Sequence, residues 1–291
     1  MKVRFAVSVG LGPPDPLGLG SVVERAEQLG FDTVWMSDVP SLPSTDPSLG
    51  VAYAAARSGR MHLGINLIPF GSTPYVVAHR LAQLDRLAGG RLLVTLVPGL
   101  DLPGERQALG TDGRHRGRMM DQVIPQLRAW WAGETVDGLA LPVGPLQQPL
   151  ELWLGGSGPE AVRRAGRLAD GWLGSLVTPA RAGEIRAAIQ AEAAAAGRTV
   201  DPEHFGLSIG YARRPGDVER AARLRPVRPR RPEDAGDPAD LVPVGADRLR
   251  RLVGELVEAG LSKFVVRPVA PVEDWEGELA WLAETVLDLQ T

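Results

Sequence analysis

The chain contains 291 residues, of which 44% are hydrophobic, and its formal net charge is −3. This composition supplies a large core, gives no basic surplus for nucleic acid or an acidic membrane, and includes no apolar run near the ~18 residues of a membrane span. Because cysteine is absent, disulfides, thiol catalysis and thiolate metal sites are excluded. The short apolar runs predict a soluble, cytoplasmic protein without a signal peptide.

Short apolar runs alternate with helical patterns along the whole chain. The first four runs cover residues 3–9, 32–38, 61–67 and 91–97. Four more cover residues 150–156, 170–176, 205–211 and 263–269. Eight strands, each followed by a helix, predict an α/β fold of the (β/α)8 TIM-barrel type, with residues 1–291 as a single domain.

The predicted helices have recognisable ends. The helix after the first strand is predicted to begin at Ser21, with Glu24 completing a capping box, and to end at Gly30. The helix after the third strand is predicted to begin at Thr73. Further helices are expected over residues 115–132, 159–169, 181–196, 246–259 and 274–288.

Two segments are longer than the connections that a minimal (β/α)8 barrel needs. Residues 98–114 are predicted to form a long loop after the fourth strand. Residues 213–243 form an Arg- and Pro-rich insertion before the last βα units, which we expect to be a lid or a partly disordered excursion. A solvated insertion without a ligand is the alternative.

Chemistry in such barrels gathers at the C-terminal ends of the strands. None of the four histidines lies at a predicted strand exit, so we expect neither a histidine base nor a metal site. Among carboxylates, only Asp38 and Asp101 lie at predicted exits. These few groups favour an organic cofactor as the source of the difficult chemistry.

The stretch "LWLGGSGPEAVRRA" (152–165) joins a predicted strand to a helix through small residues. Gly155, Gly156, Ser157 and Gly158 let a backbone approach a ligand, and a helix N-terminus attracts anions, so a phosphate site is predicted here. A plain tight turn is the alternative. A Rossmann fingerprint is disfavoured because the next strand, "GWLGSLVTP", ends without an acidic residue.

Five stretches carry a family resemblance. In chain order they are "AEQLGFDTVWMSD", "HLGINLIPFGSTPYVVAHRLAQLDRLAGGRLLVTLVPG", "LGTDGRHRGRMMDQVIPQLRAWWAGE", "PLELWLGGSGPEAVRRAGRLADGW" and "VGADRLRRLVGELVEAGLSKFVVRP". Together they resemble the bacterial-luciferase-like flavin and deazaflavin oxidoreductases, and within them the coenzyme F420-dependent branch. The resemblance implies a luciferase-like TIM barrel that binds F420, or alternatively FMN, with the cofactor phosphate at the 155–158 turn.

The resemblance also implies roles at the other strand exits. Asp38 takes the place of the acidic residue beside the cofactor ring, where it is the candidate catalytic residue; a turn or N-cap role is the alternative. Asn66 and Leu67 match the point where relatives have a non-proline cis peptide behind the ring. Gly99 and Ser175 are further candidate cofactor contacts.

Other expectations concern the substrate and partners. Arg267 is a candidate for receiving an anionic substrate, or else an ion pair at the barrel rim. The basic run at 223–231 could attract the oligoglutamate tail of F420, or be neutralised by the acidic residues that follow it. A homodimer or higher homo-oligomer is expected by likeness, and Trp130 and Trp131 are predicted to pack outward against a neighbour.

Departures from the family pattern narrow the expected reaction. Sugar-phosphate dehydrogenases of this family have a His after the strand-two acid, where this chain has Val39, and a Glu after the strand-four glycine, where it has Leu100. We therefore predict hydride transfer that reduces an unsaturated or electrophilic small molecule, in preference to alcohol oxidation. The alternatives are an FMN-dependent monooxygenase, a non-catalytic cofactor-binding homologue, and a cofactor-free barrel acting on a phosphorylated metabolite.

Overall fold

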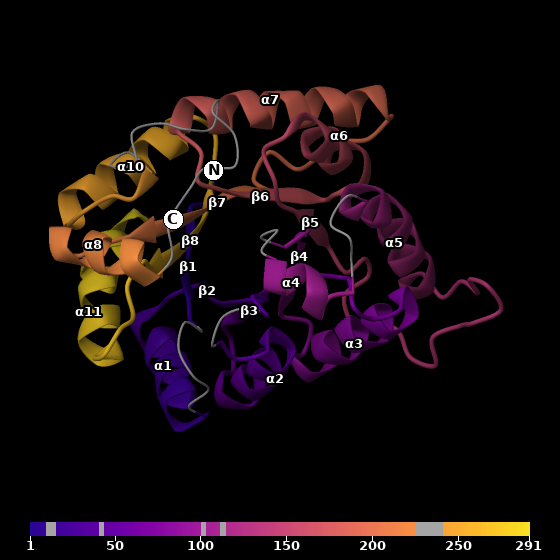
Figure 1. Cartoon of the computed structure of the whole chain (residues 1–291), viewed down its shortest axis with the longest axis horizontal. Coiled ribbons are helices and arrows are strands. Elements are labelled where there is room, and N and C mark those ends of the chain that lie inside the picture. The colour runs from indigo at the N-terminus through magenta and orange to yellow at the C-terminus, as the bar shows by residue number, and fades with distance from the viewer. Residues whose placement is uncertain (10–15, 41–43, 100–102, 111–114, 225–240) are drawn as a thin grey trace.

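Eight parallel strands form a closed barrel in the computed structural model, which describes residues 1–9, 16–40, 44–99, 103–110, 115–224 and 241–291 (Figure 1). The strands pair in chain order, and β8 closes the barrel against β1. They are β1 Arg4–Ser8, β2 Thr33–Ser37, β3 His62–Leu67, β4 Leu92–Leu96, β5 Leu152–Leu154, β6 Gly171–Ser175, β7 Phe205–Tyr211 and β8 Lys263–Pro268. The predicted TIM barrel is therefore confirmed, strand by strand.

Helices surround the barrel, and most of them begin with proline, whose fixed φ suits the first turn. They are α1 Pro16–Leu29, α2 Pro47–Arg57, α3 Pro74–Leu87, α4 Pro103–Ala108, α5 Arg116–Trp131, α6 Pro159–Leu168, α7 Pro179–Ala195, α8 Pro215–Leu224, α10 Ala246–Glu258 and α11 Trp275–Val286, with a 3-10 turn η2 at Leu287–Leu289. None of these described helices is long and apolar enough to cross a membrane.

Several predicted helix ends need correction. The capping box at Ser21 and Glu24 is wrong, because α1 already begins at Pro16. The start at Thr73 is confirmed, since its side chain accepts a hydrogen bond from the Val76 N–H. The segment predicted as a loop after the fourth strand contains α4, and the predicted insertion contains α8. Most of the basic run at 223–231 lies outside the described residues.

The paired tryptophans of α5 were predicted to face outward, and this is wrong. Trp130 is 4% exposed and Trp131 is 8% exposed. The Trp130 Nε1 donates to the Leu139 carbonyl (2.9 Å), and the Trp131 Nε1 donates to the Ala78 carbonyl (3.1 Å). Both indoles therefore belong to the core between α5, α3 and the chain that follows α5.

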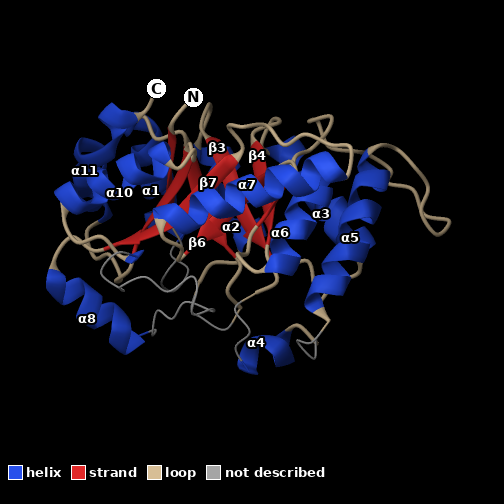
Figure 2. Cartoon of the chain, turned by 90° about the horizontal axis from the view of Figure 1, so that it is seen from above, coloured by secondary structure: helices blue, strands red, loops and turns tan. Residues whose placement is uncertain are grey.

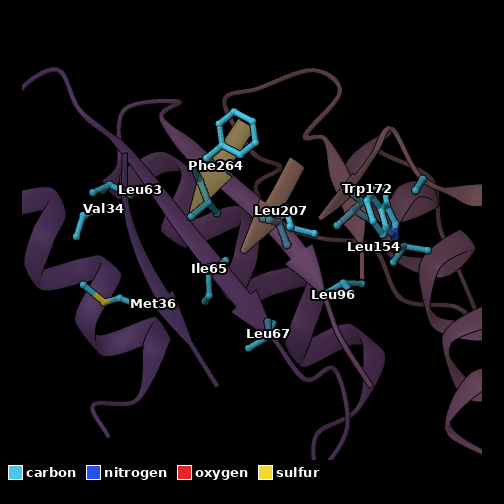
Figure 3. Close-up of a cluster of buried hydrophobic side chains, with 14 of the residues drawn as sticks. Val34, Met36, Leu63, Ile65, Leu67, Leu96, Leu154, Trp172, Leu207 and Phe264 are labelled. Carbon is cyan, nitrogen blue, oxygen red and sulfur yellow. The ribbon is translucent and has the colours of Figure 1, made fainter. Parts of the chain in front are cut away.

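Alternate residues of each strand point to opposite sides of the barrel wall. Outward side chains such as Leu63, Ile65 and Leu96 pack under the helices (Figure 3). Inward side chains form a second, smaller cluster of Ala6, Trp35, Leu173 and Val265, against which Leu93 and Trp153 pack. We call this second cluster the apolar plug.

Two glycines make room for the indoles of the plug. A Cβ at Gly64 would lie 2.0 Å from the Trp35 ring, and a Cβ at Gly171 would lie 2.4 Å from the Trp153 ring. Each tryptophan therefore covers a glycine of the next strand, and together with their neighbours they close the barrel interior.

The two ends of the barrel differ. The chain termini lie at one end, and α4 and α8 lie at the other, beyond the C-terminal ends of the strands (Figure 2). Because α4 follows β4 and α8 follows β7, this second end collects the predicted site residues. We call it the mouth.

Candidate functional site

Asp38 joins the exits of two strands. Its N–H donates to the Asn66 carbonyl (2.8 Å), and its Oδ2 accepts from the Ile68 N–H (3.3 Å). The pKa of the half-buried Asp38 carboxyl is raised to about 6, chiefly because burial disfavours the charged form; the Ile68 N–H lowers it, and the nearby Asp46 and Glu105 carboxylates raise it. Asp38 therefore gains and loses its proton near pH 6, closer to neutrality than an ordinary aspartate, while it also fixes the turn.

The predicted cis peptide between Asn66 and Leu67 is wrong. The one cis bond among the described residues is Gln148–Pro149. The physical reason is the regular parallel ladder, which continues to the end of β3: the Asn66 carbonyl accepts from Asp38, and the Leu67 carbonyl accepts from the Val97 N–H (3.0 Å). Leu67 itself points outward into the core (Figure 3).

A buried ion pair lies beside Gly99. The Glu105 side chain of α4 has no exposed surface, and its Oε1 lies 3.4 Å from Nη1 of Arg116, which is 6% exposed. The same Nη1 donates to the Pro98 carbonyl (2.6 Å). Gly99 has φ +81°, and a Cβ there would lie 2.4 Å from the Glu105 carboxylate, so only glycine fits.

Sequence reasoning missed this ion pair because its segment was predicted to be a loop. The run "PGERQALG" could have indicated a short helix, since it begins with proline and ends with glycine. Asp101, the other carboxylate predicted at a strand exit, lies outside the described residues, as does Leu100. Glu105 is thus the acidic residue that the structure adds to this part of the mouth.

The predicted phosphate turn connects β5 to α6. Gly156 has φ +107°, and a Cβ there would lie 2.9 Å from the Ala161 Cβ. Gly158 is the N-cap of α6 and, being glycine, has no side chain of its own with which to cap the N-terminal amides. The turn is held from behind by the Trp172 Nε1, which donates to the Gly156 carbonyl (2.8 Å). A backbone held open in this way fits an anion.

An arginine that sequence reasoning did not single out borders the same turn. Arg181 of α7 donates from Nη2 to the Ser157 carbonyl (3.5 Å) and forms an ion pair with Glu184 (2.9 Å). Arg181 and Pro159 also line a cavity of about 460 Å³ between α6 and α7. The turn therefore has a positive side chain on one flank.

The remaining predicted residues lie on β6 and β8. Ser175 ends β6 and is exposed, and Leu176 after it has a positive φ of 55°. Arg267 of β8 lies against β7, where a Cβ at Gly210 would be 3.3 Å from its Nη2. In the closed barrel β6 lies opposite β2, whereas only β1 separates β8 from β2, so Arg267 approaches the mouth from a strand nearer to Asp38 than Ser175 does.

A polar network borders the mouth outside β7. Glu278 of α11 accepts from the Tyr211 hydroxyl (2.7 Å) and from Arg213 (3.1 Å). Burial and the Glu278 carboxylate raise the pKa of the Tyr211 hydroxyl well above its ordinary value. These three residues line a cavity of about 200 Å³. No group of three or more potential metal ligands occurs in the described part of the chain.

A closed eight-stranded barrel whose polar side chains meet at the strand exits defines a TIM-barrel protein. The chain belongs to the luciferase-like monooxygenase family, whose model matches residues 3–260. An F420-dependent glucose-6-phosphate dehydrogenase of Beutenbergia cavernae is 36% identical over 179 residues, which are 54% of this chain and 52% of that protein. The chain spans about half the length of the curated relatives it matches.

Solved structures agree on the fold. The coenzyme F420-dependent tetrahydromethanopterin reductase of Methanopyrus kandleri is 17% identical, with a TM-score of 0.83 over 100% of both chains. The monooxygenase RslO1 of Streptomyces bottropensis is 20% identical, with a TM-score of 0.79 over 98% of this chain and 99% of that one.

Proposed function

We propose that this protein is an F420-dependent oxidoreductase that transfers a hydride between the deazaflavin and a small organic substrate. The observation that carries the proposal is the turn at Gly155–Gly158, which leads into the N-terminus of α6 and whose backbone path requires a glycine at 156, because a Cβ there would meet Ala161. The likeness to the Beutenbergia cavernae dehydrogenase supports F420 as the cofactor.

The residues of the mouth divide the work between binding and proton handling. Gly155, Gly156, Ser157 and Gly158 would hold the cofactor phosphate, and Asp38, Asn66, Gly99 and Ser175 would surround its ring, where Leu67 could contribute only its backbone. When bound, the deazaflavin supplies or accepts the hydride. Asp38, with its pKa of about 6, is mostly ionised at neutral pH but exchanges a proton readily there, and it orients the exits of β2 and β3. Arg267 would attract an anionic substrate.

The direction of reaction that we propose is reduction of an unsaturated or electrophilic acceptor. Val39 carries no base, and the Glu105 carboxylate is buried beside the Arg116 guanidinium, which makes it a poor proton carrier. Alcohol oxidation needs a base at the substrate hydroxyl, whereas reduction of an activated double bond needs positioning and a proton.

A fluorescence titration of the purified protein with F420, and in parallel with FMN, tests the cofactor. The expected result is tight F420 binding that Gly156→Ala weakens at least tenfold, because the new Cβ meets Ala161. Gly30→Ala is the matched control: Gly30 also has a positive φ of +97°, but a Cβ there meets nothing within 4 Å. Failure of both cofactors to bind would refute the proposal.

An FMN-dependent monooxygenase is the second candidate, favoured by the family and by the fold shared with the Streptomyces bottropensis monooxygenase. Preference for FMN in the same titration would select it. A cofactor that binds without turnover of any electrophilic acceptor would instead indicate a non-catalytic homologue. Light scattering of the purified protein tests the proposed homo-oligomer.

A further inference from the structure

Trp172 of β6 is the largest fully buried side chain among the described residues. It pairs with Leu154, the last residue of β5, and lies beside it in the core outside the barrel wall (Figure 3). Its ring passes over Gly174, two residues further along the same strand, where a Cβ would be 2.2 Å away. The glycine therefore lets the indole extend toward the C-terminal end of the strand, where the turn at Gly155–Gly158 lies.

The indole meets this turn from the core side. Its Nε1 donates to the Gly156 carbonyl (2.8 Å). Gly156 is exposed, whereas Trp172 has no exposed surface, so this carbonyl points inward. The carbonyl and the N–H of the next residue belong to one planar trans peptide and point in opposite directions. The Ser157 N–H is therefore directed outward, toward the exposed side of the turn.

This orientation has to be imposed on the turn, because the residues of the turn do not fix it themselves. Glycine adopts many backbone conformations, and Gly156 has a φ of +107° that few other residues adopt. The next peptide is held in a similar way by Arg181 of α7, whose Nη2 donates to the Ser157 carbonyl (3.5 Å). Two side chains from β6 and α7 thus hold consecutive carbonyls of the turn and set the direction of the amides that follow them.

We propose that Trp172 is a positioning residue for the cofactor phosphate. By holding the Gly156 carbonyl in the core, the indole directs the Ser157 N–H at the anion before the anion binds, which lowers the cost of ordering the turn on binding. An anion at this N–H polarises the peptide, and this strengthens the hydrogen bond from Trp172 in return. The inference rests on the proposed function and deepens it, because it assigns part of the phosphate affinity to a fully buried side chain.

Fluorescence titration with two probes tests the inference: the riboside of the deazaflavin and its phosphate monoester, which differ only in the phosphate. The wild type should bind the monoester more tightly. Trp172→Phe removes the donor and keeps an aromatic ring; it should raise the Kd of the monoester about tenfold and leave that of the riboside unchanged. Trp131→Phe is the matched control, because the buried Trp131 Nε1 also donates to a backbone carbonyl, that of Ala78 (3.1 Å). It should change neither Kd.

The indole N–H signal of Trp172 in the nuclear magnetic resonance spectrum gives a second measurement, which needs only the wild type. The chain has seven tryptophans, and this signal is assigned through its proximity to Gly156 and Gly174. The monoester should move the signal more than the riboside does, because only the monoester polarises the peptide that the indole holds. Inorganic phosphate alone should move it in the same direction, and the Trp131 signal should stay in place.

The outcomes separate this inference from the proposed function. If Trp172→Phe weakens neither probe, or weakens both equally, the indole has no specific role toward the phosphate and the inference fails alone. An equal loss for Trp131→Phe, or a Trp172 signal that the monoester does not move, would also overturn it. If the wild type binds the two probes equally, the phosphate does not lie at the turn, and the inference fails with that part of the proposed function. If the wild type binds neither F420 nor FMN, the proposed function itself fails.

Discussion

Replacing Asp38 with asparagine should stabilise the protein at neutral pH and leave it unchanged in acid. The unfolded chain ionises at the ordinary carboxyl pKa of 3.8, whereas the folded protein ionises Asp38 at about 6. Between these values the unfolded state has fewer bound protons, so rising pH favours unfolding. Asparagine keeps an oxygen that can accept from the Ile68 N–H and removes the buried charge.

The structure sets the size of the effect. The two pKa values differ by about 2 units, which corresponds to about 3 kcal/mol at 1.36 kcal/mol per unit. Because Asp38 is only half-buried, water screens part of this penalty, and we expect a gain of about 1–2 kcal/mol above pH 7. Urea unfolding of both proteins at intervals from pH 4 to pH 8 measures the difference in the free energy of unfolding.

The pH dependence of the stability gain tests whether ionisation of Asp38 is its cause. The gain should be near zero at pH 4, rise through pH 6 and then level off. Asp288→Asn is the control with the opposite sign: its exposed carboxylate has a pKa lowered by its hydrogen bond to Arg250, so this substitution should destabilise the protein, and more at neutral than at acid pH. A gain for Asp38→Asn that is independent of pH would refute the reasoning, because it would exclude ionisation as the cause.

Three further predictions concern stability and can be measured by urea unfolding. Gly64→Ala places a Cβ 2.0 Å from the Trp35 ring and should lower the free energy of unfolding by about 2–3 kcal/mol. The double variant with Trp35→Leu should lose less than the sum of the two single losses, and strictly additive losses would contradict the contact. Asp85→Ala removes the acceptor of three N–H groups in the chain before β5 and should cost about 3 kcal/mol; a loss below 1 kcal/mol would mean that water replaces it. Arg116→Met leaves the buried Glu105 carboxylate without this cation and should lower the free energy of unfolding by about 3–5 kcal/mol. The double variant with Glu105→Leu should be destabilised less, and equal destabilisation of the two variants would refute a charge effect.

The barrel could be predicted from the sequence because its signal is local and repeated. Each strand is a short apolar run, and most helices begin near a proline or a capping residue such as Thr73. The failure at Ser21 has the same origin, since its capping pattern competes with Pro16 five residues earlier and the proline begins the helix. When two local helix-start signals of equal strength compete, the sequence alone does not show which of them begins the helix.

The parts of the site that were missed depend on contacts between distant elements. Glu105 is buried because Arg116, in the next helix, reaches back to it. The indole of Trp130 is buried because residues after the helix fold over it and supply the Leu139 carbonyl. Neither contact leaves a pattern in the neighbouring sequence, so the segment of Glu105 was predicted as a loop and Trp130 was predicted to face outward. The exits holding Asp38 and Gly156 could be predicted, because they follow directly from strand ends.

The apolar plug, in which indoles pack over glycines, closes the barrel interior, so that the mouth is its single opening. A molecule that enters the mouth can leave only through the same opening. Of two ligands that share this space, the deeper one therefore has to enter first and leave last. If the cofactor ring occupies the deeper position, steady-state kinetics should follow a compulsory order, with the organic substrate binding after the cofactor and its product leaving before it.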